Sequence, residues 1–122
     1  MEYSIQADHE FLRVRVAGRD TDDPPSHFCA EVLRESERLG RRRILIELAQ
    51  KFPLSPSSQY ELVTRLPQLG MTPWHSIALV HREPAAKEAN GFINVVAENR
   101  DISVRNFWDV EEAADWLRSR AA

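Results

Sequence analysis

Three serines stand close together in the stretch KFPLSPSSQYELV, residues 51–63. The stretch joins an apolar run to a helical pattern, so Ser55, Ser57 and Ser58 fall where a helix begins. A serine hydroxyl at this place can cap the helix by accepting a hydrogen bond from a backbone N–H of the first turn. It can also carry a phosphate, because the N-terminus of a helix favours an anion.

The local pattern favours the capping role. Ser55 precedes Pro56, which suits the first position of a helix. Ser58 is followed by Glu61 with the spacing of a capping box. Either arrangement satisfies backbone donors without a kinase. We keep Ser57, Ser58 and Ser55 as candidate phosphorylation sites beside this simpler interpretation.

A second candidate site lies beyond the carboxyl ends of the predicted parallel strands, where ligands bind in open α/β sheets. The residues expected there are Lys51, His81, Arg82 and Trp108. His81 and Arg82 also precede a helix that begins near Pro84, so an imidazole, a cation and helix N–H groups should converge. This edge could bind a phosphate, a carboxylate or an acidic side chain of a partner. The alternative is a solvated loop in which Arg82 pairs with Glu83.

No motif in the sequence specifies a reaction. The nucleophile elbow GxSxG and the phosphate loop GxxxxGK are absent. The four histidines lack the close spacing of metal ligands. An enzyme using Ser57 or Ser58 with His81 has no support from spacing. We therefore expect no enzyme, no metal and no cofactor.

Composition narrows the class of protein. The chain has 122 residues, 43% hydrophobic and 29% charged, which predicts a single globular domain over 1–122. Its net charge is −3, so a nucleic-acid partner is not expected. The basic run at 41–43 follows Gly40 and suits the end of a helix. The polar N-terminus and the lack of a long apolar stretch predict a cytoplasmic protein without an integral membrane segment.

Hydrophobic periodicity predicts the elements that position these residues. In chain order they are a hairpin over 2–6 and 11–18, a helix ending before Gly40, a strand at 44–49, a helix ended or kinked by Pro67, a strand at 76–80, a helix within 82–99, a strand through Ile102 and Val104, and a helix over 109–120. The two central strands are almost wholly apolar, as in parallel strands covered on both faces. Glu47 interrupts the first of them. A buried carboxylate can mark a functional site, but it more often pairs with an arginine near the sheet edge, and we expect that pairing here. The order β-β-α-β-α-β-α-β-α predicts an α/β sandwich whose mixed sheet is parallel at its centre.

This order, with the stretches SIALVHREPAAKEANGF and ISVRNFWDVEEAADWL, resembles the STAS-like fold of bacterial anti-sigma-factor antagonists. The resemblance covers nearly the whole chain and is closest to the small sporulation stage II AA-like branch, which shares its architecture with the CRAL-TRIO lipid carriers. It implies a non-enzymatic regulatory module that binds a protein. In regulatory members a phosphorylatable serine starts the helix after the third strand, usually within Asp-Ser-Ser-Gly. The equivalent stretch LSPSSQYE lacks that aspartate and that glycine.

Two functions follow as expectations. In the first, a protein partner, which could be a second copy in a homodimer, docks through the helix that begins near Ser57, and serine phosphorylation gates the contact. In the second, a small apolar ligand or lipid occupies a pocket between the helices and the sheet. A chain of 122 residues leaves little interior for such a pocket once its core is filled.

Overall fold

The computed structural model describes residues 3–16, 25–48, 56–81 and 92–120. Along these residues the elements are β1 (Tyr3–Ala7), β2 (Leu12–Val16), α1 (Pro25–Leu39), β3 (Arg43–Leu48), α2 (Pro56–Arg65), β4 (Ser76–His81), α4 (Phe92–Asn99), β5 (Val104–Phe107) and α5 (Val110–Ser119). The predicted order β-β-α-β-α-β-α-β-α is therefore confirmed. The first half of the helix predicted within 82–99 lies outside the described residues.

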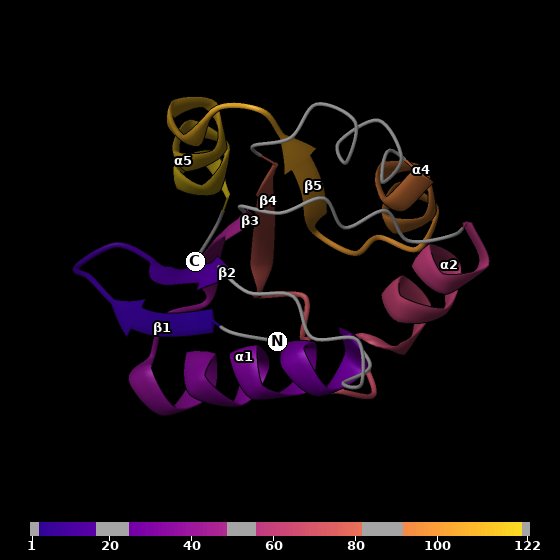
Figure 1. Ribbon diagram of the computed structural model, residues 1–122, viewed down its shortest axis with the longest axis horizontal. Helices are drawn as coiled ribbons and strands as arrows, with labels where there is room; N and C mark the ends of the chain where they lie inside the picture. The colour runs from indigo at the N-terminus through magenta and orange to yellow at the C-terminus, as the bar shows by residue number, and fades with distance from the viewer. Residues whose placement is uncertain (1–2, 17–24, 49–55, 82–91, 121–122) are drawn as a thin grey trace.

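The strands form one five-stranded sheet in the order β1-β2-β3-β4-β5 (Figure 1). β1 pairs antiparallel with β2, and every later pair is parallel. The mixed sheet with a parallel centre is thus confirmed. β1 and β5 are its two edges.

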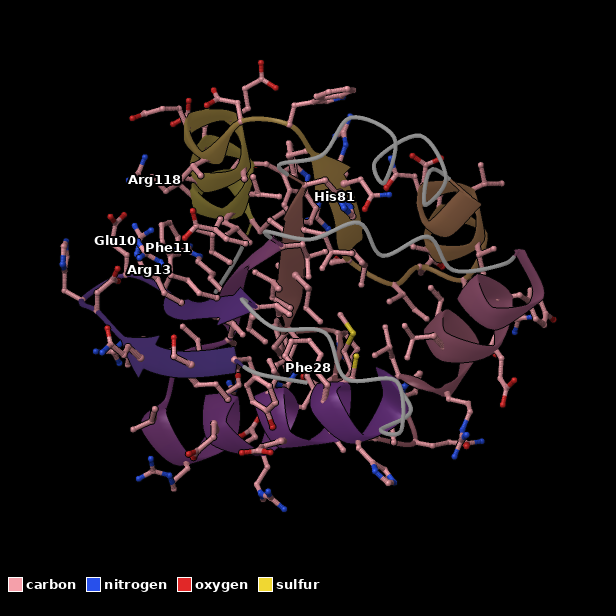
Figure 2. The ribbon with its side chains drawn as sticks, in the orientation of Figure 1. Glu10, Phe11, Arg13, Phe28, His81 and Arg118 are labelled. Atoms are coloured by element: carbon pink, nitrogen blue, oxygen red, sulfur yellow. The ribbon has the colours of Figure 1, made fainter. Side chains whose placement is uncertain are left out.

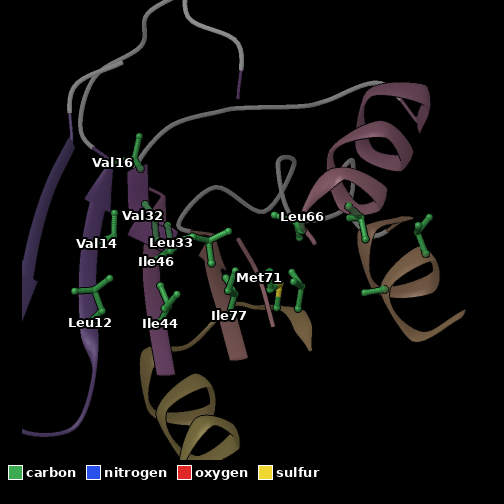
Figure 3. Close-up of a cluster of buried hydrophobic side chains, with 14 residues drawn as sticks. Leu12, Val14, Val16, Val32, Leu33, Ile44, Ile46, Leu66, Met71 and Ile77 are labelled. Carbon is green, nitrogen blue, oxygen red and sulfur yellow. The ribbon is translucent and has the colours of Figure 1, made fainter. Parts of the chain in front are cut away.

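Helices cover both faces of the sheet. On one face, α1, α2 and α4 enclose the larger of two apolar clusters. Figure 3 shows the buried side chains of this cluster. Val32 and Leu33 come from α1, Leu66 follows α2, and Ile44 and Ile77 come from the two central strands. This layer exists because alternate residues of each strand point to the same face.

The opposite face is covered by α5. Its buried residues Ala113, Ala114 and Leu117 pack on Leu45 and Val80 of the sheet. β3 and β4 are therefore buried on both sides, which explains their nearly continuous apolar sequences. No helix within the described ranges is long and apolar enough to span a membrane.

Local signals fix several of the boundaries. α1 ends before Gly40, whose φ of 67° is the left-handed conformation that glycine adopts readily. α2 ends at Arg65, shortly before Pro67, as the sequence predicts. Asp109 stands at the N-cap of α5, but its side chain makes no capping hydrogen bond.

Candidate functional site

The serines of the opening stretch fall where the sequence places them along the chain. Ser57 and Ser58 lie in the first turn of α2, which begins at Pro56. Ser55 lies outside the described residues, as do Lys51 and Arg82 from the predicted edge site. That Lys51 and Arg82 meet His81 and Trp108 at this edge of the sheet therefore stays a prediction.

His81 is the last residue of β4, and its side chain lies inside the protein rather than in a solvated loop. It is 1% exposed, and its Nε2 lies 2.8 Å from Oδ1 of Asn106, which is 6% exposed. Because an amide oxygen can only accept, Nε2 carries the proton in this contact. Figure 2 shows His81 beside β4 and β5, turned into the protein. Trp108, by contrast, follows β5 and is 47% exposed.

A second asparagine extends this contact to a helix. The backbone N–H of Asn106 donates to Oδ1 of Asn94 on α4 at 2.9 Å. His81, Asn106 and Asn94 thus link β4, β5 and α4, through the side chain of Asn106 on one side and its backbone N–H on the other. Sequence reasoning missed both asparagines. The alternation of Ile77, Leu79 and His81 along β4 was the available signal that His81 faces the core.

The arginines of the run 41–43 are occupied by structural contacts. Nε of Arg41 donates to the backbone oxygen of Asp8 at 2.7 Å, and Nη2 of Arg43 donates to the backbone oxygen of Arg120 at 2.8 Å. Arg42 forms an ion pair with Glu37 at 3.5 Å. These contacts support the interpretation of this run as the end of a helix.

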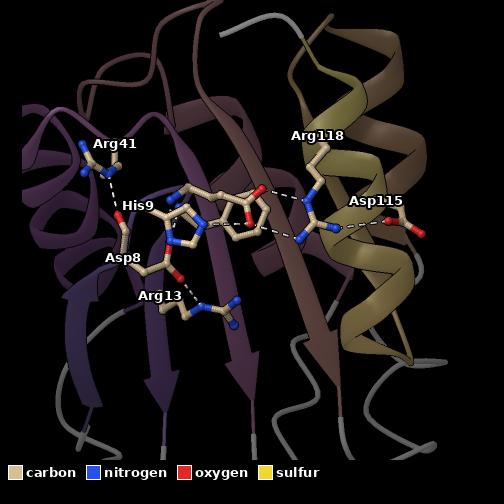
Figure 4. Close-up of polar contacts among 8 residues, drawn as sticks. Asp8, His9, Arg13, Arg41, Asp115 and Arg118 are labelled. Carbon is tan, nitrogen blue, oxygen red and sulfur yellow. Dashed lines mark hydrogen bonds and ion pairs between the residues drawn. The ribbon is translucent and has the colours of Figure 1, made fainter.

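The hairpin turn between β1 and β2 carries a balanced group of charges (Figure 4). Asp8 accepts a hydrogen bond from Nε of Arg13, and Glu10 pairs with Arg118 of α5 at 2.8 Å. Arg118 also pairs with Asp115 at 3.3 Å. Each of these arginines faces a carboxylate, so the group fastens the hairpin to α5 rather than presenting a basic patch.

Glu47 has the arginine partner that the sequence predicts. Its Oε2 accepts a hydrogen bond from Nε of Arg15 at 3.2 Å, and the two residues are paired in register across β2 and β3. The Glu47 side chain is 8% exposed and the Arg15 side chain 72%. The carboxylate is thus buried beneath a cation that reaches solvent, which is a structural arrangement.

The clearest candidate for an interaction surface lies on α2 and α4. Tyr60 of α2 is 46% exposed and Val95 of α4 is 53% exposed, although the two helices pack against each other. Nη2 of Arg100 donates to the Tyr60 hydroxyl at 2.5 Å, and the guanidinium carbon lies 5.2 Å from the ring centroid. We call Tyr60, Val95 and Arg100 the α2–α4 surface. The sequence signal for it was the position of Tyr60 and Val95 outside the apolar stripes.

Among the described helices, α2 is the one without an extensive contact with a strand. It packs mainly against α4, with a smaller contact to α1 (Figure 1). The exposed residues among the described side chains of this helix are Tyr60, Glu61 and Arg65.

The part of the chain that the structure describes contains neither a group of metal ligands nor a cysteine in a setting that favours the thiolate. There, no three residues among the histidines, cysteines, aspartates and glutamates are grouped so that they could hold a metal ion. Burial raises the pKa of the Cys29 thiol to about 12, which disfavours a reactive thiolate.

No family model matches this sequence, and no curated protein matches it.

Proposed function

We propose that this chain is a non-enzymatic protein-interaction module of the STAS type, which docks a protein partner through the α2–α4 surface. The element order and the mixed sheet support the likeness in fold. The observation that carries the proposal is the exposure of Tyr60 and Val95 on two helices at the rim of the sheet.

The chemistry of this surface suits a protein partner. Tyrosine and arginine are enriched among the residues that dominate binding energy at protein interfaces. Tyr60 offers a ring held by Arg100, so part of its conformational entropy is already lost before binding. Truncating such an anchor commonly costs about 2 kcal/mol, or about a thirtyfold loss of affinity.

Phosphorylation would act through the start of α2. Ser57 and Ser58 lie in its first turn, one turn before Tyr60. A phosphate there is compatible with the helix, but its charge must be desolvated when a partner covers the neighbouring surface. Phosphorylation should therefore weaken docking.

The proposal is tested by capturing partners of the tagged protein in its own host. The wild-type chain should retain a partner that the double variant Tyr60→Ala/Val95→Ala loses. Trp74→Ala is the matched control, because Trp74 is 56% exposed but lies on neither helix. A partner captured equally by the double variant would contradict the proposed surface.

Gating is tested with the same partner. Ser57→Asp/Ser58→Asp should lower its recovery, while Ser57→Ala/Ser58→Ala should retain it. Native mass spectrometry of the protein from its host completes the test. A mass increase of one phosphate on α2 would support gating, whereas an apolar adduct lost only on denaturation would favour a ligand carrier instead.

A further inference from the structure

A groove of about 420 Å³ runs beside β5, between α4 and α5. Val104 and Arg105 both line it. Successive residues of a strand point to opposite faces of the sheet, so a groove that touches both lies along the outer edge of β5. β5 is the last strand of the sheet, and among the described residues no further strand pairs with this edge.

The backbone of β5 alternates between facing β4 and facing the groove. The N–H of Ile77 in β4 donates to the oxygen of Ser103 at 2.8 Å, so the Ser103 carbonyl faces β4. In a parallel pair the next residue turns its backbone groups the other way. Val104 and Asn106 therefore turn their N–H groups towards the edge.

Both of these N–H groups are bound within the chain. The N–H of Val104 donates to the oxygen of Ile102 at 3.0 Å. The N–H of Asn106 donates to the side-chain oxygen of Asn94 at 2.9 Å. Exposed edges invite pairing with other chains, and proteins commonly block them. Asn94 acts as such a block, and it does so through a side chain rather than through another strand.

The walls of the groove carry opposite charges. Glu98 and Asp101 line it from α4 and the turn after α4, whereas Arg105 and Arg120 line it from β5 and the end of α5. Within the described residues, none of these four side chains forms an ion pair. Nη2 of Arg120 donates only to the hydroxyl of Ser103, at 2.8 Å.

We propose that this groove binds an extended segment of a partner protein whose side chains alternate between basic and acidic. An extended chain sends successive side chains to opposite faces. A segment laid along β5 would place its basic side chains against Glu98 and Asp101, and its acidic ones against Arg105 and Arg120. It would add a strand to the sheet, a known mode of peptide recognition. The site is separate from the α2–α4 surface and does not depend on it.

The first test compares two labelled peptides by fluorescence anisotropy. One is a short capped peptide of alternating lysine and glutamate, and the other has the same composition with all its lysines before its glutamates. The alternating peptide should bind at least about tenfold more tightly, and Arg105→Glu should remove that preference. Arg105 is exposed, so the fold should tolerate the change. Equal affinity for the two peptides, or an unchanged preference in Arg105→Glu, would overturn the proposal.

The second test concerns Asn94. An incoming strand must compete with Asn94 for the N–H of Asn106. Asn94→Ala should therefore raise the affinity for the alternating peptide about fivefold, the equivalent of one net hydrogen bond. Val95→Ala, the adjacent change on α4 outside the groove, should leave it unaltered. A lower affinity in Asn94→Ala would overturn the blocking role.

Measuring the oligomeric state of the wild-type chain in solution distinguishes a partner segment in the groove from a second copy of the chain. A monomer that binds the alternating peptide supports a partner segment. A dimer that Arg105→Glu dissociates would assign the groove to a second copy and overturn the proposal.

Discussion

Nε2 of His75 lies 3.2 Å from Oε1 of Glu37, at the point where β4 begins. His75 is wholly buried, while the Glu37 side chain is 48% exposed. The backbone N–H of Thr72 donates to Nδ1 of His75 at 2.9 Å. Nδ1 is therefore an acceptor, and in the neutral ring the proton resides on Nε2, facing Glu37.

This arrangement predicts that the protein loses stability in mild acid. Burial lowers the pKa of His75 below its usual 6.5, Glu37 raises it, and Arg42 lowers it further. The unfolded chain then binds a proton more readily than the folded chain does. This contribution to the free energy of unfolding is complete above the ordinary histidine pKa and is lost as the pH falls below it.

Urea denaturation at about pH 8 and about pH 5.5 would measure this loss on the two sides of the ordinary histidine pKa. His75→Gln should have a smaller difference in unfolding free energy between the two conditions. His9→Gln is the control, because the His9 side chain is 89% exposed. If His9→Gln and His75→Gln behaved alike, the loss would have another origin.

The central strands could be predicted from sequence because burial on both faces leaves an unbroken apolar signal. The pairing of Glu47 with an arginine could also be expected, since a buried carboxylate needs a partner. The position of His81 was harder to predict. Whether a residue ends a strand or begins a loop is decided within one position, and this decides whether its side chain is buried.

The contact between Asn94 and Asn106 was beyond sequence reasoning. The two residues are 12 positions apart on different elements, and asparagine in a helix or a strand carries no pairing signal of its own. The sequence also does not predict that Asp101 and Arg105 line the same groove, because a charged residue on a helix or strand usually indicates only a face exposed to solvent. Their meeting depends on the placement of α4 and α5 around one sheet edge.

Asp8 is predicted to stabilise the hairpin through its charge. Burial opposes ionisation, but the N–H of Phe11, the guanidinium of Arg13 and the N–H of Glu10 together lower the pKa of Asp8 to about 2. Its pKa in the folded chain lies below the ordinary value, so the stabilisation is present above about pH 3.8 and is lost as the pH falls to about 2.

Asp8→Asn removes this charge while keeping a side-chain acceptor. Since the Asp8 side chain is 33% exposed, we discount for solvent screening and expect a loss of about 1 to 2 kcal/mol at neutral pH. Asp115→Asn is the control, with a side chain 77% exposed. Urea denaturation of both variants measures the difference, and equal losses would show that the turn does not depend on the Asp8 charge.

Phe11 is predicted to be the main apolar anchor between the hairpin and α5. It is 0% exposed, and the guanidinium carbons of Arg13 and Arg118 lie 5.7 and 5.6 Å from its ring centroid (Figure 2). Phe11→Ala should lower the free energy of unfolding by about 3 to 5 kcal/mol, because it leaves a cavity. Phe11→Leu should cost only about 1 kcal/mol.

Trp74→Ala serves as the control for this series, because an exposed residue should change the free energy of unfolding by less than about 0.5 kcal/mol. Thermal denaturation followed by circular dichroism would rank the variants. A cost for Phe11→Ala close to that of Trp74→Ala would show that α5 is held without this ring.

Two helices end in the same way but with different residues. After α1, the N–H of Gly40 donates to the oxygen of Glu37 at 3.3 Å, and Gly40 has a φ of 67°. After α4, the N–H of Asp101 donates to the oxygen of Glu98 at 3.3 Å, and Asp101 has a φ of 55°. The left-handed conformation favours glycine, so Asp101 is the less favourable choice.

Exchanging the two residue types should therefore have opposite effects. Gly40→Asp should destabilise the protein by about 0.5 to 1 kcal/mol, and Asp101→Gly should stabilise it by a similar amount. A Cβ at Gly40 would meet no atom within 4 Å, so its cost is conformational rather than steric. Urea denaturation measures both changes, and a destabilising Asp101→Gly would show that the aspartate contributes more to the fold than its backbone costs.

The same variant also separates stability from binding. Asp101 supplies one of the two carboxylates on the α4 side of the groove. If the groove holds basic side chains there, Asp101→Gly should bind the alternating peptide several-fold more weakly while the protein itself becomes more stable. A rise in stability with unchanged peptide affinity would show that the carboxylate does not serve the groove. Weaker binding in a more stable protein would explain why aspartate stands where glycine fits the backbone better.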